Sequence, residues 1–60
     1  MELTQQQKAI NWFQERGIEA QAHEDSVLIQ CLEYYVLVSN SEIEYRAELY
    51  DEQYNVTTNN

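Results

Sequence analysis

The chain has 60 residues, a net charge of −8 and a pI near 4.2, and hydrophobic residues make up 43% of it. That apolar fraction is too high for a disordered chain, and the length allows one small domain that buries only about 60% of its unfolded surface. The acidic charge opposes direct binding to nucleic acid or to an anionic membrane surface, and it favours a basic protein partner.

The first predicted element is a helix over about residues 4–16. Thr4 and Gln7 form a capping-box pattern at its start. Apolar residues at helical spacing follow, namely Ala9, Ile10 and Phe13. Gly17 is placed to end the helix in the left-handed conformation, with Ile18 folding back onto the last turn.

After this helix the hydrophobic period changes to two, which predicts a strand over residues 18–23. Residues 24–26 read as a turn, because Asp and Ser side chains bond to nearby backbone groups. The next stretch, VLIQCLEYYVLV, is the most β-branched in the chain and could form one strand of twelve residues. Strands are usually nearer five or six residues, so we divide it at Leu32-Glu33 into strands over 27–32 and 34–39.

The last predicted element is a helix over about residues 42–54. It begins with two overlapping capping boxes, Ser39 with Glu42 and Ser41 with Glu44. One helical face then carries Ile43, Ala47, Tyr50 and Tyr54. A strand is the rival interpretation, since Ile43, Tyr45, Ala47 and Leu49 also alternate. The caps and an i, i+4 pairing of Glu42 with Arg46 favour the helix.

These elements predict an α+β fold of order α-β-β-β-α, a small antiparallel meander with two helices packed on one face. Residues 1–54 form a single domain, and the polar residues 55–60 are expected to be a disordered tail. The predicted core consists of Ile10, Phe13, Ile18, Val27, Ile29, Val36, Val38, Ile43, Ala47 and Tyr50.

Little in the sequence indicates catalysis, a metal or a cofactor. His23, Glu24 and Asp25 are the only cluster that resembles a site, but neighbouring strand residues point to opposite faces and a zinc site needs three or four ligands. Cys31 lies in an apolar run, which predicts an inert thiol. We also expect no room for a substrate cleft of about 300 Å³ or more. The sequence therefore predicts a protein that is not an enzyme.

The first functional hypothesis is a small acidic interaction module that self-associates. Four apolar residues are predicted to lie on the sheet face without helices, namely Leu28, Leu32, Tyr35 and Leu37. Such a patch indicates a binding surface, most simply that of a homodimer. The absence of a signal-peptide pattern, of an apolar run of roughly 20 residues and of a second cysteine predicts a cytoplasmic protein without a membrane span.

The alternative hypothesis is an inhibitor that mimics nucleic acid and binds a basic, DNA- or RNA-binding protein. It uses one acidic face of the last helix, formed by Glu44, Glu48, Asp51 and Glu52. Spaced carboxylates can imitate a phosphate backbone, and short acidic proteins of this kind are familiar among phage-encoded inhibitors. That analogy rests on size and charge, and a solvated face that keeps a small protein soluble explains the same residues.

Overall fold

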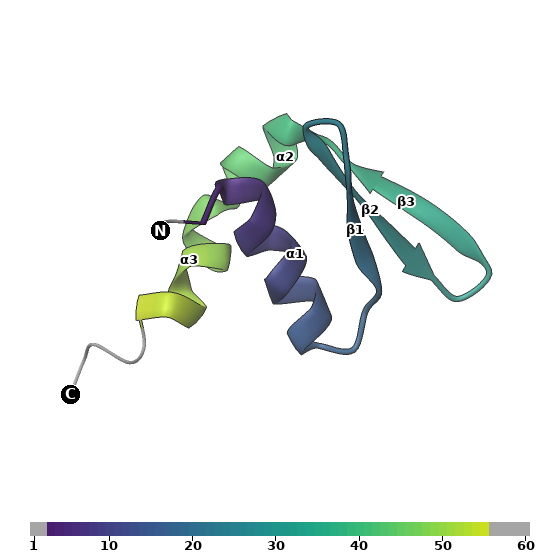
Figure 1. Cartoon of the computed structure of the whole chain (residues 1–60), viewed down its shortest axis with the longest axis horizontal. Coiled ribbons are helices and arrows are strands. Elements are labelled where there is room, and N and C mark those ends of the chain that lie inside the picture. The colour runs from purple at the N-terminus through teal and green to yellow at the C-terminus, as the bar shows by residue number, and fades with distance from the viewer. Residues whose placement is uncertain (1–2, 56–60) are drawn as a thin grey trace.

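The computed structural model describes residues 3–55, and the side chains of residues 3–52. It has an α+β fold in which the closing helix is divided in two (Figure 1). The elements are α1 (Gln5–Glu15), β1 (Ala20–His23), β2 (Ser26–Cys31), β3 (Tyr34–Val38), α2 (Asn40–Tyr45) and α3 (Ala47–Asn55). The predicted fold class and element order are thus confirmed. Asn55 ends α3, and the rest of the predicted tail lies outside the described residues.

Both ends of α1 follow the signals in the sequence. The Thr4 side chain accepts a hydrogen bond from the Gln7 backbone N–H at 3.1 Å. At the other end Gly17 has a φ of +80°. The N–H of Ile18 donates to the Phe13 carbonyl at 3.0 Å, which completes a Schellman motif. The chain therefore turns sharply from α1 toward β1.

The sheet is an antiparallel meander of order β1-β2-β3 with two-residue turns. In the register of β2 with β3, Val27 lies opposite Val38 and Cys31 lies opposite Tyr34. The predicted division at Leu32-Glu33 is therefore confirmed. The amide nitrogen Nε2 of Gln6 in α1 donates to two carbonyl oxygens of the first hairpin, at 2.9 and 2.8 Å, and so ties that turn to the helix layer.

Each hairpin turn begins with a residue in the left-handed region that is not glycine. Glu24 has a φ of +57° and Leu32 has a φ of +55°. Two-residue hairpins favour positive φ because it matches the twist of the strands, but Gly, Asn and Asp are the residues that usually provide it. A bulky side chain in this conformation costs roughly 1–2 kcal/mol. Leu32 is also 89% exposed, so no packing offsets the cost.

We expect Leu32→Gly to raise the free energy of unfolding by about 1 kcal/mol, because the relieved backbone strain exceeds the added chain entropy of glycine. Urea unfolding at low protein concentration measures the change. Glu33→Gly is the matched control, since Glu33 lies in the same turn without positive φ, and it should lower stability. Equal changes in the free energy of unfolding for the two substitutions would show that the backbone of Leu32 is not strained.

The C-terminal segment differs from the prediction in having a break at Arg46. Ser39, from the first of the two predicted capping boxes, caps α2 by accepting a hydrogen bond from the Glu42 N–H at 3.3 Å. The predicted pairing of Glu42 with Arg46 is confirmed, with Oε2 and Nε 2.7 Å apart. This hydrogen bond and the charge of Glu42 raise the pKa of Arg46 above its ordinary value. Arg46 itself leaves the helical conformation, so α2 and α3 are separate helices.

The break allows the two short helices to take different positions. α2 packs against α1 and β2, whereas α3 packs mainly along α1, which lies between α3 and the sheet (Figure 1). Lys8 in α1 and Asp51 in α3 form an ion pair with Nζ and Oδ1 3.0 Å apart. This ion pair joins α1 directly to α3. Because α3 lies beyond α1 and not on the sheet, the helices cover only part of the sheet.

The core lies where α1, β2 and the two C-terminal helices meet. Its buried residues are Ala9, Ile10, Val27, Ile29, Ile43 and Tyr50. Two predicted core residues are wrong: Val36 is 37% exposed and Ala47 is half-exposed outside the buried cluster. Val36 is exposed because β3 is the strand farthest from α1, and Ala47 because the helix begins again there. The prediction also missed Ala9, which is fully buried.

An aromatic cluster joins α1 to α3. The Tyr50 ring lies 5.5 Å from the Trp12 ring and 6.1 Å from the Phe13 ring, measured between centroids. Tyr50 is only 2% exposed. Burial raises the pKa of the Tyr50 phenol above its ordinary value, because the ionised form loses its hydration.

We therefore expect stability to fall at alkaline pH. The unfolded chain releases the Tyr50 proton near pH 10, before the folded chain does, so this contribution is complete below about pH 10 and is lost as pH rises through the higher folded-state pKa. Thermal unfolding between pH 8 and pH 12 measures the loss. Tyr50→Phe keeps the ring but cannot ionise, so its melting temperature should fall less steeply. If the melting temperatures of the two proteins fell equally steeply with pH, Tyr50 would not be the source of the alkaline loss of stability.

Candidate interaction surface

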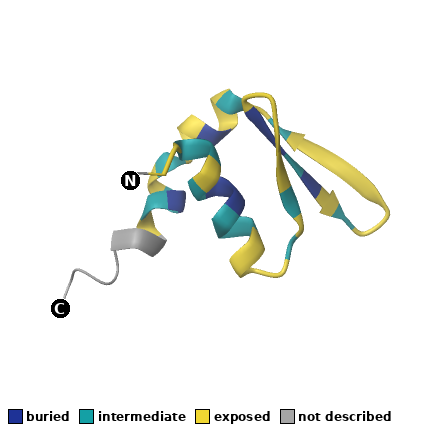
Figure 2. Ribbon diagram, in the orientation of Figure 1, coloured by how far each residue is buried: buried dark blue, intermediate teal, exposed yellow. Residues whose placement is uncertain are grey.

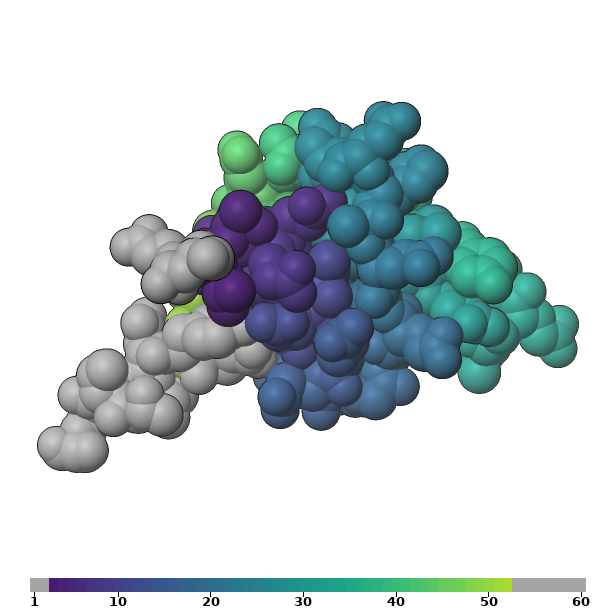
Figure 3. Space-filling view, in the orientation of Figure 1, coloured from purple at the N-terminus to yellow at the C-terminus, as the bar shows by residue number. Residues whose placement is uncertain are grey.

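The β2–β3 hairpin extends away from the helices and exposes most of β3. Tyr34 is 60%, Tyr35 63% and Leu37 51% exposed. In Figure 2 the outer strand is coloured as exposed along most of its length, and Figure 3 shows the hairpin projecting beyond the rest of the molecule. With Leu32 at the tip, the hairpin presents the main group of large exposed apolar side chains among the described residues.

Three of the four residues predicted for the open sheet face share one face. Leu28 lies opposite Leu37, and Tyr35 lies two residues from Leu37 on the same strand. Val27 and Ile29 belong to the core, so the alternating Leu28 points to the face away from α1. Leu28 is half-buried there, whereas Tyr35 and Leu37 are exposed. Leu32 lies in the turn and not on this face.

The opposite face of β3 is exposed as well, which the sequence analysis missed. Tyr34 and Val36 lie opposite Cys31 and Ile29, on the side of the sheet that carries the helices. Both are nevertheless exposed, because the helices pack on β1 and β2. The composition of YYVLV could have indicated an exposed apolar strand, because it has no charged residue on either face.

β3 also has an open backbone edge, because within residues 3–55 β2 is its only neighbour in the sheet. The Gln30 N–H donates to the Glu19 carbonyl at 3.0 Å, so even-numbered residues of β2 bond toward β1 and odd-numbered ones toward β3. The partners of those odd-numbered residues are Tyr34, Val36 and Val38. The N–H and C=O groups of Tyr35 and Leu37 therefore point to the open edge.

The four carboxylates predicted as an acidic face are divided between two helices. Glu44 lies in α2, and the other three lie in α3. Glu44, Glu48 and Glu52 are exposed. Asp51 differs, because its carboxylate is half-buried and paired with Lys8. Its charge is therefore partly neutralised, and the break at Arg46 removes the single helical spacing that the prediction assumed.

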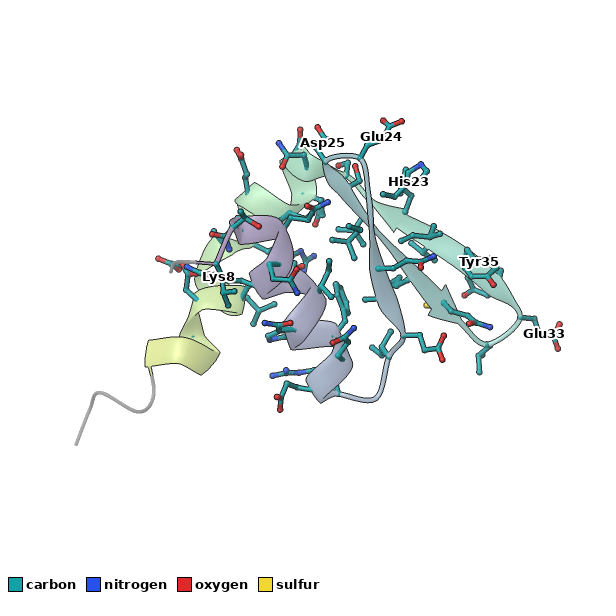
Figure 4. All side chains as sticks on the ribbon, in the orientation of Figure 1. Lys8, His23, Glu24, Asp25, Glu33 and Tyr35 are labelled. Atoms are coloured by element: carbon teal, nitrogen blue, oxygen red, sulfur yellow. The ribbon has the colours of Figure 1, made fainter. Side chains whose placement is uncertain are left out.

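The titratable cluster of the first hairpin lies on the surface. His23 ends β1, while Glu24 and Asp25 form the turn (Figure 4). All three are exposed, and Ser26 Oγ donates to Asp25 Oδ1 at 3.2 Å. Within residues 3–55 no three such side chains come together as metal ligands would. Cys31 is half-buried at the end of β2.

The expectation that the chain has no room for a cleft is wrong. An open hollow of about 530 Å³ lies between the end of α1, the start of β1 and the uncovered sheet face. Glu19 and Tyr35 are the titratable residues among those that line it. The other lining residues are amides, a glycine and small or aliphatic side chains, namely Gln14, Gly17, Ile18, Ala20, Gln21, Leu28 and Gln30. The lining thus combines amide and aliphatic side chains with one carboxyl group and one phenol.

Comparison with protein-family models, with curated proteins and with solved structures gave no match to this chain. Among the described residues, none of the helices combines the length and the apolar character needed to cross a membrane. The candidate surface is therefore defined by its own geometry: an uncharged, exposed outer strand with a free backbone edge.

Proposed function

We propose that this chain is a small acidic protein-interaction module without catalytic activity, and that it self-associates through the β2–β3 hairpin. The observation that carries this proposal is the exposure of β3 on both faces and along one edge. Large exposed apolar surfaces on a small protein mark interaction sites. Tyrosine is enriched at such sites because it joins a large ring to a hydrogen-bonding group.

Sedimentation over a dilution series from about 1 mM to about 1 μM tests this proposal. We expect a monomer–dimer equilibrium that becomes stronger as salt is added, because two chains of charge −8 repel each other and salt screens that repulsion. Tyr35→Ser and Leu37→Ser should weaken association, whereas Tyr45→Ser, at an exposed position on α2, should not. A monomer at every concentration and salt level would contradict self-association.

The alternative is binding of a basic protein through acidic side chains. The exposure of Glu44, Glu48 and Glu52 on consecutive helices favours it, whereas the pairing of Asp51 with Lys8 counts against a four-residue display. Salt distinguishes the two proposals, because binding through exposed charges weakens as salt rises. Changing the three glutamates to glutamine should abolish binding to a basic partner, but it should not weaken the hairpin association, because it lowers the repulsion between two acidic chains.

A further inference from the structure

We propose that the occupant of the open β3 edge is the β3 strand of a second copy, paired antiparallel about Val36 so that two three-stranded sheets become one of six strands. This inference rests on the proposed self-association and specifies how it occurs. It differs from contact between two uncovered sheet faces, because backbone hydrogen bonds across the edge hold the copies together.

The first argument is the register. The outward N–H and C=O groups of Tyr35 and Leu37 must meet outward groups of the partner strand. Pairing about Val36 places Tyr35 of each copy opposite Leu37 of the other, which allows four backbone hydrogen bonds. Among the symmetric antiparallel registers, it is also the one in which every residue of Tyr34–Val38 has a partner in the other copy. An isologous contact of this kind closes on itself as a dimer and does not extend into a fibre.

The second argument is the chemistry of the facing side chains. Tyr35 meets Leu37 on the uncovered face, while Tyr34 meets Val38 and Val36 meets Val36 on the other face. Aromatic and β-branched cross-strand pairs of this kind each contribute roughly 0.2–1 kcal/mol. Next to the strand, the charged Glu33 comes opposite the uncharged Ser39. The register therefore creates no like-charged pair, although each chain carries a charge of −8.

The third argument is the contrast between the two edges. Natural proteins protect edge strands with lysine, proline, bulges or covering elements. β1 is a strand of only four residues, AQAH, and very short edge strands are protected from pairing by their length. β3 is a longer apolar strand, YYVLV, with no such protection in its sequence. The difference indicates that the β3 edge is suited to pairing and the β1 edge is not.

The fourth argument is area. The exposed parts of β3 and Leu32 amount to roughly 500 Å² in each copy, given that a large aromatic side chain presents about 150–250 Å². Complete coverage of this surface in both copies, which edge pairing achieves only in part, would bury about 1,000 Å², the lower end of specific interfaces. The edge pair is therefore expected to form a weak dimer, with an interface smaller than this limit.

Chemical synthesis of the full chain allows a direct test of the edge. N-methylation of Leu37 removes one outward N–H and leaves every side chain intact. We expect it to weaken the dimer at least tenfold, because each dimer loses two hydrogen bonds and gains two methyl clashes. N-methylation of Ala22 is the matched control, since its N–H points outward from β1 by the same alternation, and it should leave the dimer unchanged.

A charge exchange at Val36 tests the register. Val36→Lys and Val36→Glu, each alone, place two like charges opposite each other and should weaken the dimer at least tenfold. An equimolar mixture should restore it as a heterodimer, detected by native mass spectrometry, while circular dichroism confirms that each variant is folded.

The outcomes separate the two proposals. A wild-type dimer that withstands N-methylation of Leu37 and shows no recovery in the Lys/Glu mixture would overturn edge pairing while leaving self-association in place. A chain that stays monomeric up to about 1 mM would overturn both. Edge pairing would be established if the dimer is lost on N-methylation of Leu37 but not of Ala22, and if it is recovered in the mixture of Val36→Lys with Val36→Glu.

Discussion

Ile43→Ala is expected to remove a large part of the stability of the chain, lowering the free energy of unfolding by about 2–5 kcal/mol. Ile43 is 0% exposed in α2 and belongs to the cluster formed with α1 and β2. Replacing a buried Ile with Ala costs about 2–5 kcal/mol, through lost transfer energy and the cavity left behind. A domain of this length has a free energy of unfolding of roughly 3–9 kcal/mol, so one cavity removes a large part of it.

Circular dichroism with thermal and urea unfolding measures that loss. Tyr45→Ala is a matched control, because Tyr45 lies in the same helix, is larger and is 85% exposed. Its stability should change by less than about 1 kcal/mol. If the two variants unfold alike, Ile43 does not lie in the core, and the placement of α2 against α1 and β2 is wrong.

Tyr50→Ala should be at least as damaging, with a loss of about 3–5 kcal/mol. The Tyr50 ring packs against both Trp12 and Phe13 and is the main buried side chain that α3 contributes. Without it, α3 retains the partly buried Leu49 and the Lys8–Asp51 ion pair, which contributes at most about 1 kcal/mol at a partly exposed site. We therefore expect α3 to separate from α1.

Trp12 reports this change directly, because it is the only tryptophan in the chain. In Tyr50→Ala its fluorescence should move to longer wavelength and become accessible to quenchers, even below the unfolding transition. Tyr50→Phe keeps the ring contacts and should retain the native emission. A native Trp12 spectrum in Tyr50→Ala would mean that α3 does not depend on this ring.

Local signals in the sequence predicted most of the fold. Thr4 and Gly17 located the ends of α1, because capping and left-handed conformations depend on residues close in the chain. The length of the apolar stretch located the turn at Leu32-Glu33, although neither residue favours positive φ. The break at Arg46 was not predictable, because both capping boxes and the Glu42–Arg46 pair suit a continuous helix. It lies where the chain changes from the contacts of α2 with α1 and β2 to those of α3 along α1, and no local pattern encodes these tertiary contacts.

The candidate surface was predicted only in part for the same reason. Alternation placed Leu28, Tyr35 and Leu37 on one face, since period two is a local property. The exposure of Tyr34 and Val36 depends on how far the helices reach across the sheet. The helices cover only the strands on which α1 packs, β1 and β2, and this packing is a tertiary property. Strand order likewise decides that β3, and not β2, offers a free edge.

The alternating direction of the β3 amide groups has a kinetic consequence. The amide protons of Tyr34, Val36 and Val38 are tied to β2 and should exchange with deuterated solvent only when the sheet opens. Those of Tyr35 and Leu37 should exchange much faster in dilute protein. At high concentration, pairing of two copies would slow the exchange of these two amide protons selectively. Their exchange rates, compared with those of Tyr34, Val36 and Val38, would therefore report whether the β3 edge is paired.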